Sequence, residues 1–532
     1  MSNKKSIGSY YTPKIIADFL VNYLSDKLND NKFISVLEPS AGDGIFIEAI
    51  YKHKQLARKI RRVIAVEQSK RELNKITNKV KQKTFTATHS DFLDFQSNSK
   101  DKFSLVIGNP PYIKKSLLKK SQINFCKSIH EKANLADNRP KNIWTAFLVR
   151  CIEFTSPDGI LAFVLPSELL QVKFAAELRE LILREFDRVE IFTFNELLFK
   201  DCKGQDTLLL IGQRKSEQKG VYYCNINKLV DLEEGKFALA QNIKIKESKW
   251  THHHLETDEI ELLEKLKSQL HTIDNYCSSK AGIVTAANDF FIVDKETIEK
   301  YSLQSFVKPI IQKGAFVNGS VVLTAREFQL LIDSSKPTYL VALDKNSTIR
   351  KNARMWSYLE IGKQRELDKR YKTALRDIWY EVPNIGNAPE AFFFKRCNEY
   401  PKLIKNAARV LSTDSAYTIA MKDNFHIESL IFSFYNSLTL AFAELHGRYY
   451  GGGVLELTPN EFKNLPTPFI DIPLARFNNY VIDFKNKSSI KDVCKRNDSL
   501  ILKSFDNSLD DDSIDKLYNI REKLYLRRIK TN

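Results

Sequence analysis

One short stretch of the sequence combines the side chains and the placement of a catalytic loop. Asn109, Pro110, Pro111 and Tyr112 directly follow residues 103–107, whose apolar pattern predicts a buried strand. The ends of such strands carry the active sites of open α/β sheets. The amide oxygen of Asn109 and the carbonyl of Pro110 can accept both hydrogens of a planar amino group, which localises its lone pair toward an electrophile. With Tyr112 as a stacking face, this stretch predicts chemistry on the amine of a heterocyclic base.

A second motif offers groups that could hold a cofactor. Gly42 and Gly44, separated by one residue, let the backbone turn tightly beneath a ligand, but the third glycine of the dinucleotide fingerprint is absent. A pyrophosphate cofactor is therefore disfavoured. Glu67 ends a predicted strand where a carboxylate can hold ribose hydroxyls. Asp91 and Phe92 follow the next strand and offer a carboxylate and an aromatic ring to a purine.

The elements that must position these motifs alternate between strands and helices. We expect helices at 14–28 and 172–186 and strands at 33–38, 63–67, 84–88, 103–107, 160–165, 189–194 and 208–211. This alternation predicts an α/β fold with a doubly wound, mostly parallel sheet over residues 1–215.

The alternation breaks at about residue 216, and an irregular α+β pattern follows. We expect strands at 282–293, 306–311 and 320–324 and helices at 259–270, 429–445 and 513–526. Residues 216–532 are therefore predicted to form a second domain that ends in a helix. The triplet His252-His253-His254 precedes a helix and is interpreted as a solvated segment rather than a metal site, so no metal is expected.

The positive charge of the chain is concentrated in one segment. The 532 residues carry 82 Lys+Arg and 65 Asp+Glu, a net charge of +17, and residues 51–150 alone hold 23 basic and 7 acidic residues, a balance of +16. Such a segment suits a polyanion, because each neutralised phosphate releases condensed counterions. A lysine-rich solvated surface explains the charge equally well, so the motifs must decide between these interpretations.

The composition of the chain restricts the cellular compartment and the classes of protein to which it can belong. The chain is 43% hydrophobic, which is too apolar for a disordered protein. Its 532 residues are too many for a single hydrophobic core, so two or more domains are expected. Its seven cysteines are scattered without zinc-finger spacing, and no disulfide framework is indicated. The N-terminus lacks a signal peptide, and no apolar run nears the roughly 20 residues that span a bilayer. A cytoplasmic protein without a membrane partner is expected.

Taken in order, these motifs resemble the gamma-class N6-adenine-specific DNA methyltransferases of bacterial type II restriction-modification systems. The resemblance covers residues 6–215, from Tyr11-Thr12-Pro13 to the last predicted strand of the sheet. It implies a Rossmann-like catalytic domain that uses S-adenosyl-L-methionine as its cofactor, followed by a target-recognition domain that binds double-stranded DNA.

The resemblance also implies roles for individual residues. Asn109 and Pro110 would accept hydrogen bonds from the target amine, and Tyr112 and Phe199 would stack on the flipped base. Tyr11 and Thr12 would close over the cofactor. The remaining cofactor-binding residues would be Glu38, Pro39, Ser40, Ala41, Gly42 and Gly44 for the methionine part, Glu67 for the ribose, Asp91 and Phe92 for the adenine, and Asn109.

One segment departs from the family pattern, and two others extend it. Where many members have an acidic residue followed by an aromatic, residues 141–145 read Lys-Asn-Ile-Trp-Thr, which puts a cofactor contact there in doubt. Residues 282–291 and 448–453 resemble segments of the target-recognition region of the family. The glycines 451–453 could contact DNA or form a structural turn.

The sequence therefore predicts site-specific methylation of adenine N6 in double-stranded DNA. Such methylation protects the site from a cognate restriction endonuclease, which need not be bound to this protein. A monomer is expected, cytoplasmic and associated with the nucleoid through DNA. The alternatives are RNA adenine methylation, protein-glutamine methylation and a non-catalytic DNA-binding subunit; a fused nuclease is disfavoured because the Tyr-Thr-Pro motif begins at residue 11.

Overall fold

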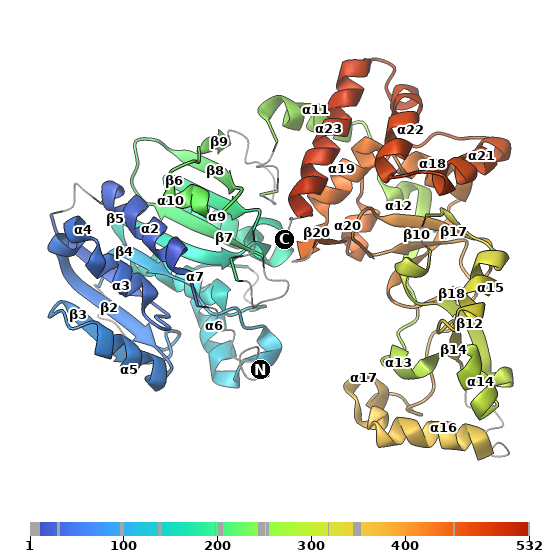
Figure 1. Ribbon diagram of the computed structural model, residues 1–532, viewed down its shortest axis with the longest axis horizontal. Coiled ribbons are helices and arrows are strands. Elements are labelled where there is room, and N and C mark those ends of the chain that lie inside the picture. Colours follow the sequence, from blue (N-terminus) through green and yellow to red (C-terminus); the bar gives the residue numbers. More distant parts are fainter. Residues whose placement is uncertain are drawn as a thin grey trace. The chain divides into compact units, whose positions relative to one another are not determined.

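The chain forms two compact units, each described here by itself (Figure 1). The first comprises the residues up to Thr257 with two short later segments, and the second comprises Asp258–Tyr449 and Gly453–Ile529. The computed structural model describes residues 11–28, 32–95, 101–136, 141–196, 198–199, 206–242, 250–251, 255–317, 319–343, 353–450 and 453–529.

The first unit is built on a nine-stranded sheet with the order β3-β2-β1-β4-β5-β7-β6-β8-β9. Strands β1 to β5 run parallel, whereas β7 is antiparallel to both β5 and β6. This arrangement confirms the predicted doubly wound, mostly parallel sheet. The strands are β1 (Ile34–Glu38), β2 (Ile60–Glu67), β3 (Phe85–His89), β4 (Phe103–Gly108), β5 (Thr155–Pro166), β6 (Arg188–Phe194), β7 (Thr207–Gln213), β8 (Gly220–Ile226) and β9 (Ala240–Asn242).

Helices of this unit bury apolar residues in the same core as the strands. In α2, Ile16, Leu20 and Leu24 recur every fourth residue and are fully buried, as the predicted amphipathic helix requires. The helices are α2 (Lys14–Lys27), α3 (Ile45–Lys52), α4 (Lys54–Lys59), α5 (Lys70–Lys79), α6 (Lys120–Lys132), α7 (Trp144–Phe154), α8 (Glu168–Gln171), α9 (Ala176–Glu185) and α10 (Val230–Glu233).

The first unit extends beyond the boundary that the sequence predicts near residue 215. Strand β8 pairs with β6 from Gly220 to Ile226, and β9 pairs with β8. The polar stretch after β7, where the sequence predicts the domain boundary, is therefore a connection within one sheet. The alternation of strands and helices stops near the edge of this sheet rather than at the end of the domain. The main segment of the compact unit ends at Thr257.

The second unit is an irregular α+β assembly, as expected, with three sheets of order β10-β19-β15-β17-β13, β11-β14-β12-β18 and β16-β21-β20. Its strands are β10 (Cys277–Ala281), β11 (Ile292–Val293), β12 (Val307–Ile311), β13 (Val322–Leu323), β14 (Tyr339–Val341), β15 (Ala391–Phe394), β16 (Arg396–Cys397), β17 (Lys402–Asn406), β18 (Leu411–Ser412), β19 (Ala416–Met421), β20 (Arg448–Tyr450) and β21 (Val454–Glu456). Its helices are α11 (Thr257–Lys267), α12 (Ile273–Tyr276), α13 (Asn288–Phe291), α14 (Lys295–Tyr301), α15 (Ala325–Asp333), α16 (Ala353–Gln364), α17 (Tyr371–Ala374), α18 (Ile427–Phe434), α19 (Ser437–His446), α20 (Pro459–Lys463), α21 (Leu474–Lys485), α22 (Ile490–Phe505) and α23 (Asp511–Arg528).

Two predicted elements of the second unit are wrong in detail. Most of the strand expected at 282–293 is loop and the short helix α13, and only Ile292–Val293 is extended. The helix expected at 429–445 is split into α18 and α19 because the Asn436 side chain accepts a hydrogen bond from the Thr439 amide at 2.9 Å and starts a new helix. The predicted C-terminal helix is α23, which Asp510 caps through the Ser513 amide.

None of the helices in the described ranges combines the length and the apolar character needed to cross a bilayer.

Candidate active site

The fold of the first unit creates a crevice at one defined place in the sheet. Strand β1 lies between β2 and β4, so the connections on its two sides lead in opposite directions. Open α/β sheets bind ligands at such a switch point, beyond the carboxyl ends of the strands. A cavity of about 760 Å³ opens there, lined by Tyr11, Pro39, Ser40, Gly42, Asp43, Glu67, Gln68, Ser69, Arg71, Glu72, Lys75, Ser90, Asp91, Phe92, Asn109, Pro111, Ile113, Gln122, Ile143 and Phe147.

The cavity brings together many of the residues selected from the sequence. Those that line it are Tyr11, Pro39, Ser40, Gly42, Glu67, Asp91, Phe92 and Asn109. The other predicted residues do not line it, and all of them except Phe199 are near neighbours in the chain of residues that do. These are Thr12, Glu38, Ala41, Gly44, Pro110, Tyr112 and Phe199.

The loop after β1 owes its shape to two glycines in left-handed conformations. Gly42 has φ +53° and Gly44 has φ +81°, a backbone that other residues rarely adopt. A Cβ on Gly44 would also lie 2.9 Å from a side-chain carbon of Ile76 in α5. Gly44 thus permits both the turn into α3 and the close packing of two helices. The aromatic ring of Tyr11 lies against the position a Gly42 side chain would occupy, at 3.8 Å.

The two carboxylates of the cavity wall are held by hydrogen bonds. Glu67 accepts from the backbone amides of Gly42 at 2.9 Å and Ser69 at 2.7 Å. Asp91 accepts from its neighbour Leu93 and, at 3.0 Å, from the side-chain amide of Gln122 in α6. Each carboxylate has four acceptor positions, so both retain capacity for ligand hydroxyl or amino groups.

Three carboxyl groups lie in the cavity wall or directly beside it in the chain, and the pKa of each is raised. Burial raises the pKa of Glu38 well above its ordinary value, and the charges of Asp43 and Glu67 raise it further. Burial likewise raises the pKa of Asp43 and of Glu67, although Lys79 opposes the first shift and the Ser69 and Gly42 amides oppose the second. A site with these groups favours a ligand that carries positive charge.

The loop after β4 is tied to the rest of the site. The side-chain amide of Asn109 donates to the Thr12 hydroxyl at 3.3 Å, and the Ser40 hydroxyl donates to the Asn109 carbonyl at 3.1 Å. Tyr112 is 7% exposed, and its hydroxyl donates to the Val164 carbonyl of β5 at 3.0 Å. The predicted catalytic stretch is therefore a braced loop rather than a mobile turn.

Several lining residues escaped the sequence analysis. Gln68 and Ser69 directly follow Glu67, so extending the strand-end search by two positions would have found them. Gln122 is 31 residues from Asp91 and gave no local signal. Ile143 and Phe147 also line the cavity, so the segment that departs from the family pattern still faces it, with apolar groups.

The predicted second stacking residue, Phe199, is buried at 5% exposure in the core of the first unit. Its chain neighbours 200–205 lie outside the described residues, as do His252–His254 and glycines 451 and 452.

Lysines crowd the chain immediately after the braced loop. Lys114, Lys115, Lys119 and Lys120 are all exposed, on and around the start of α6. This exposure places a positive surface next to the loop that carries Asn109, within the same unit.

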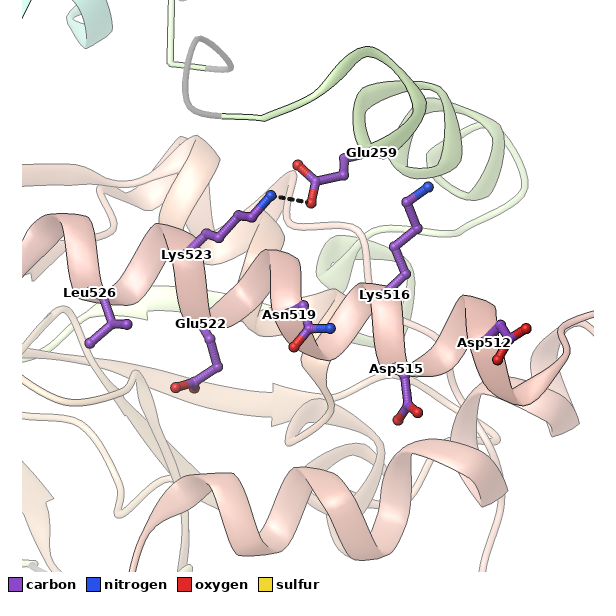
Figure 2. Close-up of a pocket in the computed structure, with 8 residues that line it drawn as sticks. All are labelled: Glu259, Asp512, Asp515, Lys516, Asn519, Glu522, Lys523 and Leu526. Atoms are coloured by element: carbon purple, nitrogen blue, oxygen red, sulfur yellow. Dashed lines mark hydrogen bonds and ion pairs between the residues drawn. The ribbon is translucent and has the colours of Figure 1, made fainter. Parts of the chain in front are cut away.

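A second hollow, of about 510 Å³, lies on the second unit beside α11 and α23 (Figure 2). Its cations are already engaged: Lys523 binds Glu259 at 2.6 Å, and Lys516 binds Asp258. Glu522, on the same helix, binds Lys491 and Arg521. The hollow is thus a surface where ion pairs join helices, in contrast to the cavity of the first unit.

The fold, the cavity at the switch point and the Asn-Pro-Pro-Tyr loop define the first unit as an S-adenosyl-L-methionine-dependent methyltransferase. Two family models match successive parts of the chain: "Eco57I restriction-modification methylase" over residues 26–199 and "Type II methyltransferase M.Eco57I, C-terminal domain" over residues 247–502. The chain belongs to this family of restriction-modification methylases.

Individual relatives agree with this assignment. Type II methyltransferase M.AccI of Acinetobacter calcoaceticus is 24% identical over 553 residues, which cover 98% of this chain and 94% of the relative. Modification methylase CviBIII of Paramecium bursaria Chlorella virus NC1A is 28% identical over 221 residues, 41% of this chain and 52% of the relative.

Solved structures share the fold over nearly the whole chain. The type IIL restriction-modification enzyme MmeI, in complex with DNA, aligns with a TM-score of 0.61 and 14% identity over 99% of this chain and 76% of that chain. The DrdV–DNA complex aligns with a TM-score of 0.53 and 12% identity over 91% and 58%. At these identities the likeness establishes the fold alone.

Proposed function

We propose that this protein transfers a methyl group from S-adenosyl-L-methionine to N6 of adenine in double-stranded DNA, at a site also cut by a cognate restriction endonuclease. The observation that carries the proposal is the position of Asn109. It lies in the wall of the cavity that also contains Glu67 and Asp91. A group that can hold an amine thus shares one cavity with groups that can hold a nucleoside.

The cavity residues suit this cofactor. When bound, S-adenosyl-L-methionine supplies a methyl group on a positively charged sulfonium. Glu67 would accept hydrogen bonds from the ribose hydroxyls, and Asp91 and Phe92 would hold the adenine. Burial raises the pKa of Glu38, Asp43 and Glu67, and a cationic ligand beside these carboxyls would compensate their charge. Tyr11 covers the loop at Gly42.

Asn109 and Pro110 prepare the target amine. The hydrogen bond to Thr12 orients the Asn109 side chain with its amide nitrogen toward Thr12 and its oxygen on the opposite branch. That oxygen and the Pro110 carbonyl accept the two amine hydrogens, so the nitrogen lone pair points at the methyl group. No covalent bond between enzyme and DNA forms.

The base must leave the duplex to reach these acceptors, at an unstacking cost of a few kcal/mol. Tyr112 and Phe199 then stack on it. Because Tyr112 is only 7% exposed, its ring becomes available to a base through a local rearrangement of the loop.

The exposed lysines after the loop bind phosphates beside the flipped base, and the second unit reads the target sequence. A single chain that contains both functions acts as a monomer. The cognate endonuclease recognises the same DNA site and need not contact the methyltransferase. The protein acts on the DNA of the bacterial nucleoid.

Mapping N6-methyladenine by single-molecule sequencing of genomic DNA from a methylation-free host tests the proposal. Cells with the wild-type chain should carry methylation at one short motif, and cells with Asn109→Ala should carry none. Purified Asn109→Ala should still bind the cofactor. Unmethylated DNA from cells with soluble, cofactor-binding wild-type protein would redirect the search to RNA or protein-glutamine substrates, each testable with labelled cofactor.

A further inference from the structure

Helices α16 and α17 and the turn between them present cations that lack an acidic partner. Figure 1 shows this region at one extremity of the second unit, near α13 and α14. Two of its lysines are neutralised locally, since Lys363 binds Glu360 at 3.1 Å and Lys369 binds Glu366 at 3.0 Å. Three other exposed cations of this region form no ion pair with any residue in the described part of the chain: Arg365, Arg370 and Lys372.

Large apolar side chains are exposed beside these cations. Tyr371 is 80% exposed and Leu375 is 71% exposed, the two highest values among the large hydrophobic residues of the described chain. They are four positions apart across α17, so they project from one side of the helical turn. Arg370 and Lys372 adjoin Tyr371 in sequence. Exposed basic and apolar side chains are therefore adjacent in this segment.

This surface stands on a rigid base. The buried Thr373 hydroxyl donates to the Arg370 carbonyl at 3.0 Å, which closes the turn of α17. Arg376 donates to the Thr285 carbonyl at 2.8 Å and lies over the ring of Phe291. Gly362 leaves room for Trp379, because a Cβ there would lie 2.2 Å from the indole ring. The exposed side chain of Tyr371 therefore belongs to a helical turn that these contacts hold in place.

We propose that the α16–α17 surface, formed by Arg365, Arg370, Tyr371, Lys372 and Leu375, binds double-stranded DNA. The proposal rests on the proposed function, since it names a contact of the same substrate. The three unpaired cations bind backbone phosphates, and Tyr371 and Leu375 pack against sugars and base edges in a groove, as apolar side chains of DNA-bending proteins do.

Charge complementarity selects DNA over a protein partner or a second copy of this chain. Charged residues are depleted from the cores of protein interfaces, whereas phosphate contacts are made chiefly by arginine and lysine. Backbone contacts carry no sequence information. The α16–α17 surface therefore contributes affinity for any duplex, while base-specific contacts lie elsewhere in the second unit.

The cationic half is tested with the triple variant Arg365→Ala, Arg370→Ala, Lys372→Ala in the full chain. Methyl transfer from labelled cofactor to plasmid DNA from a methylation-free host is followed at rising salt. The KM for DNA should rise with kcat unchanged, and the slope of log(1/KM) against log salt should fall by about 2 to 3, since each phosphate contact contributes about 0.9. The charge-matched control Lys265→Ala, Lys267→Ala, Lys495→Ala, on α11 and α22, should keep the wild-type slope.

The apolar residues of the surface are tested with a second variant, for which a different salt dependence is expected. Tyr371→Ala with Leu375→Ala should raise the KM for DNA roughly tenfold, in the range of stacking contacts, but leave the salt slope unchanged because no counterions are involved. Thermal melts and cofactor binding should match wild type for both variants, because the replaced side chains are exposed.

The outcomes separate this proposal from the proposed function. Wild-type protein that methylates DNA, with both variants keeping its KM and salt slope, overturns the DNA role of the α16–α17 surface alone. Light scattering identifies the competing occupant: a mass change of the apolar variant with an unchanged KM for DNA assigns the surface to a second copy and also overturns the proposal. Absence of methylated DNA with wild type instead overturns the proposed function.

Discussion

The carboxyl groups at the cavity of the first unit and two buried carboxyl groups of the second unit differ in how the chain compensates their charge. In the first, Glu38, Asp43 and Glu67 gather at the cavity and form no ion pair with a described residue, and one oxygen of Glu38 lacks any hydrogen-bond partner among them. In the second, Glu444 holds Arg528 through two bonds of 2.8 Å. Asp498 accepts from the Ser437 amide at 2.8 Å and hydroxyl at 2.5 Å.

We interpret the first set as carboxyls positioned for a ligand and the second as carboxyls that stabilise the fold. A buried charge without a partner destabilises the protein, and a site retains it where a bound group supplies the compensation. A paired buried charge has its compensation in the chain itself. Substitutions of the cavity carboxyls should therefore change ligand affinity more than stability, and those of the paired carboxyls of the second unit should do the reverse.

The largest expected effect comes from breaking the pair in the second unit. Glu444→Leu leaves the guanidinium of Arg528 buried without its anion, and we expect a loss of about 3 to 5 kcal/mol in the free energy of unfolding. Arg528 also donates to the Asn398 carbonyl at 2.5 Å and to the Gly453 carbonyl, so the end of α23 should loosen from the loop after β20. Urea denaturation followed by circular dichroism measures the loss.

The double variant Glu444→Leu with Arg528→Met is the matched control. It removes both charges and fills the volume with apolar groups, so it should recover much of the loss. Equal destabilisation of the single and double variants would show that packing, rather than the unpaired charge, dominates at this position.

The matching substitution in the first unit should affect binding instead. Glu67→Gln keeps one acceptor for the Gly42 or Ser69 amide but removes the charge that we propose holds the ribose hydroxyls. We expect the Kd for S-adenosyl-L-methionine, measured by calorimetry, to rise about 10- to 100-fold, as for loss of hydrogen bonds to a charged group. The free energy of unfolding without cofactor should change by about 1 kcal/mol or less. A large loss of stability with unchanged Kd would contradict the comparison.

A smaller effect is expected at Gln122, which acts through Asp91. Its amide holds one Asp91 oxygen at 3.0 Å, so Gln122→Ala should raise the KM for the cofactor about three- to tenfold and leave kcat unchanged. Gln122→Asn, which keeps the amide on a shorter arm, should recover part of the affinity, and Gln122→Glu should weaken binding further by placing two carboxylates together. A fall in kcat for Gln122→Ala would indicate a role outside cofactor positioning.

The sequence predicted the first unit in detail because its signals are local. Apolar runs such as β4 and four-residue spacing such as that of Ile16 and Leu20 depend on neighbours in the chain, and parallel strands then bring their carboxyl ends to one edge. The second unit has two- and three-residue strands whose pairing joins distant segments, as β12 pairs with β18. Such short strands show no alternation of apolar and polar residues that could be detected. The prediction of a strand at 282–293 was wrong for this reason.

The cavity shows the same limit. Strand-end residues such as Glu67 and Asp91 could be placed from their motifs, and both line it. Gln122 could not, because its position depends on how α6 packs across the sheet edge. The burial of Tyr112 and of Phe199 could not be predicted either, because a sequence motif does not show which other residues pack over its side chains.

The smallest predicted effect concerns pH and Asp498. Burial raises the pKa of this carboxyl to about 7 in the folded chain, against a partly opposing effect of the Ser437 hydrogen bonds and Arg521. A carboxyl whose pKa is higher folded than unfolded binds more protons in the folded state, so its contribution to stability is present at low pH and is lost as pH rises toward and through 7. Between pH 8 and pH 6 wild type should gain about 1 kcal/mol from this group.

Asp498→Asn isolates that contribution, because the amide does not titrate and still offers an acceptor to the Ser437 amide. The difference in unfolding free energy between wild type and Asp498→Asn should therefore shift in favour of wild type as pH falls from 8 to 6, while the carboxyls of the cavity cancel in the comparison. A pH-independent difference would mean that Ser437 and Arg521 hold Asp498 ionised throughout. In that case the second unit compensates its buried charge even more completely than its hydrogen bonds suggest.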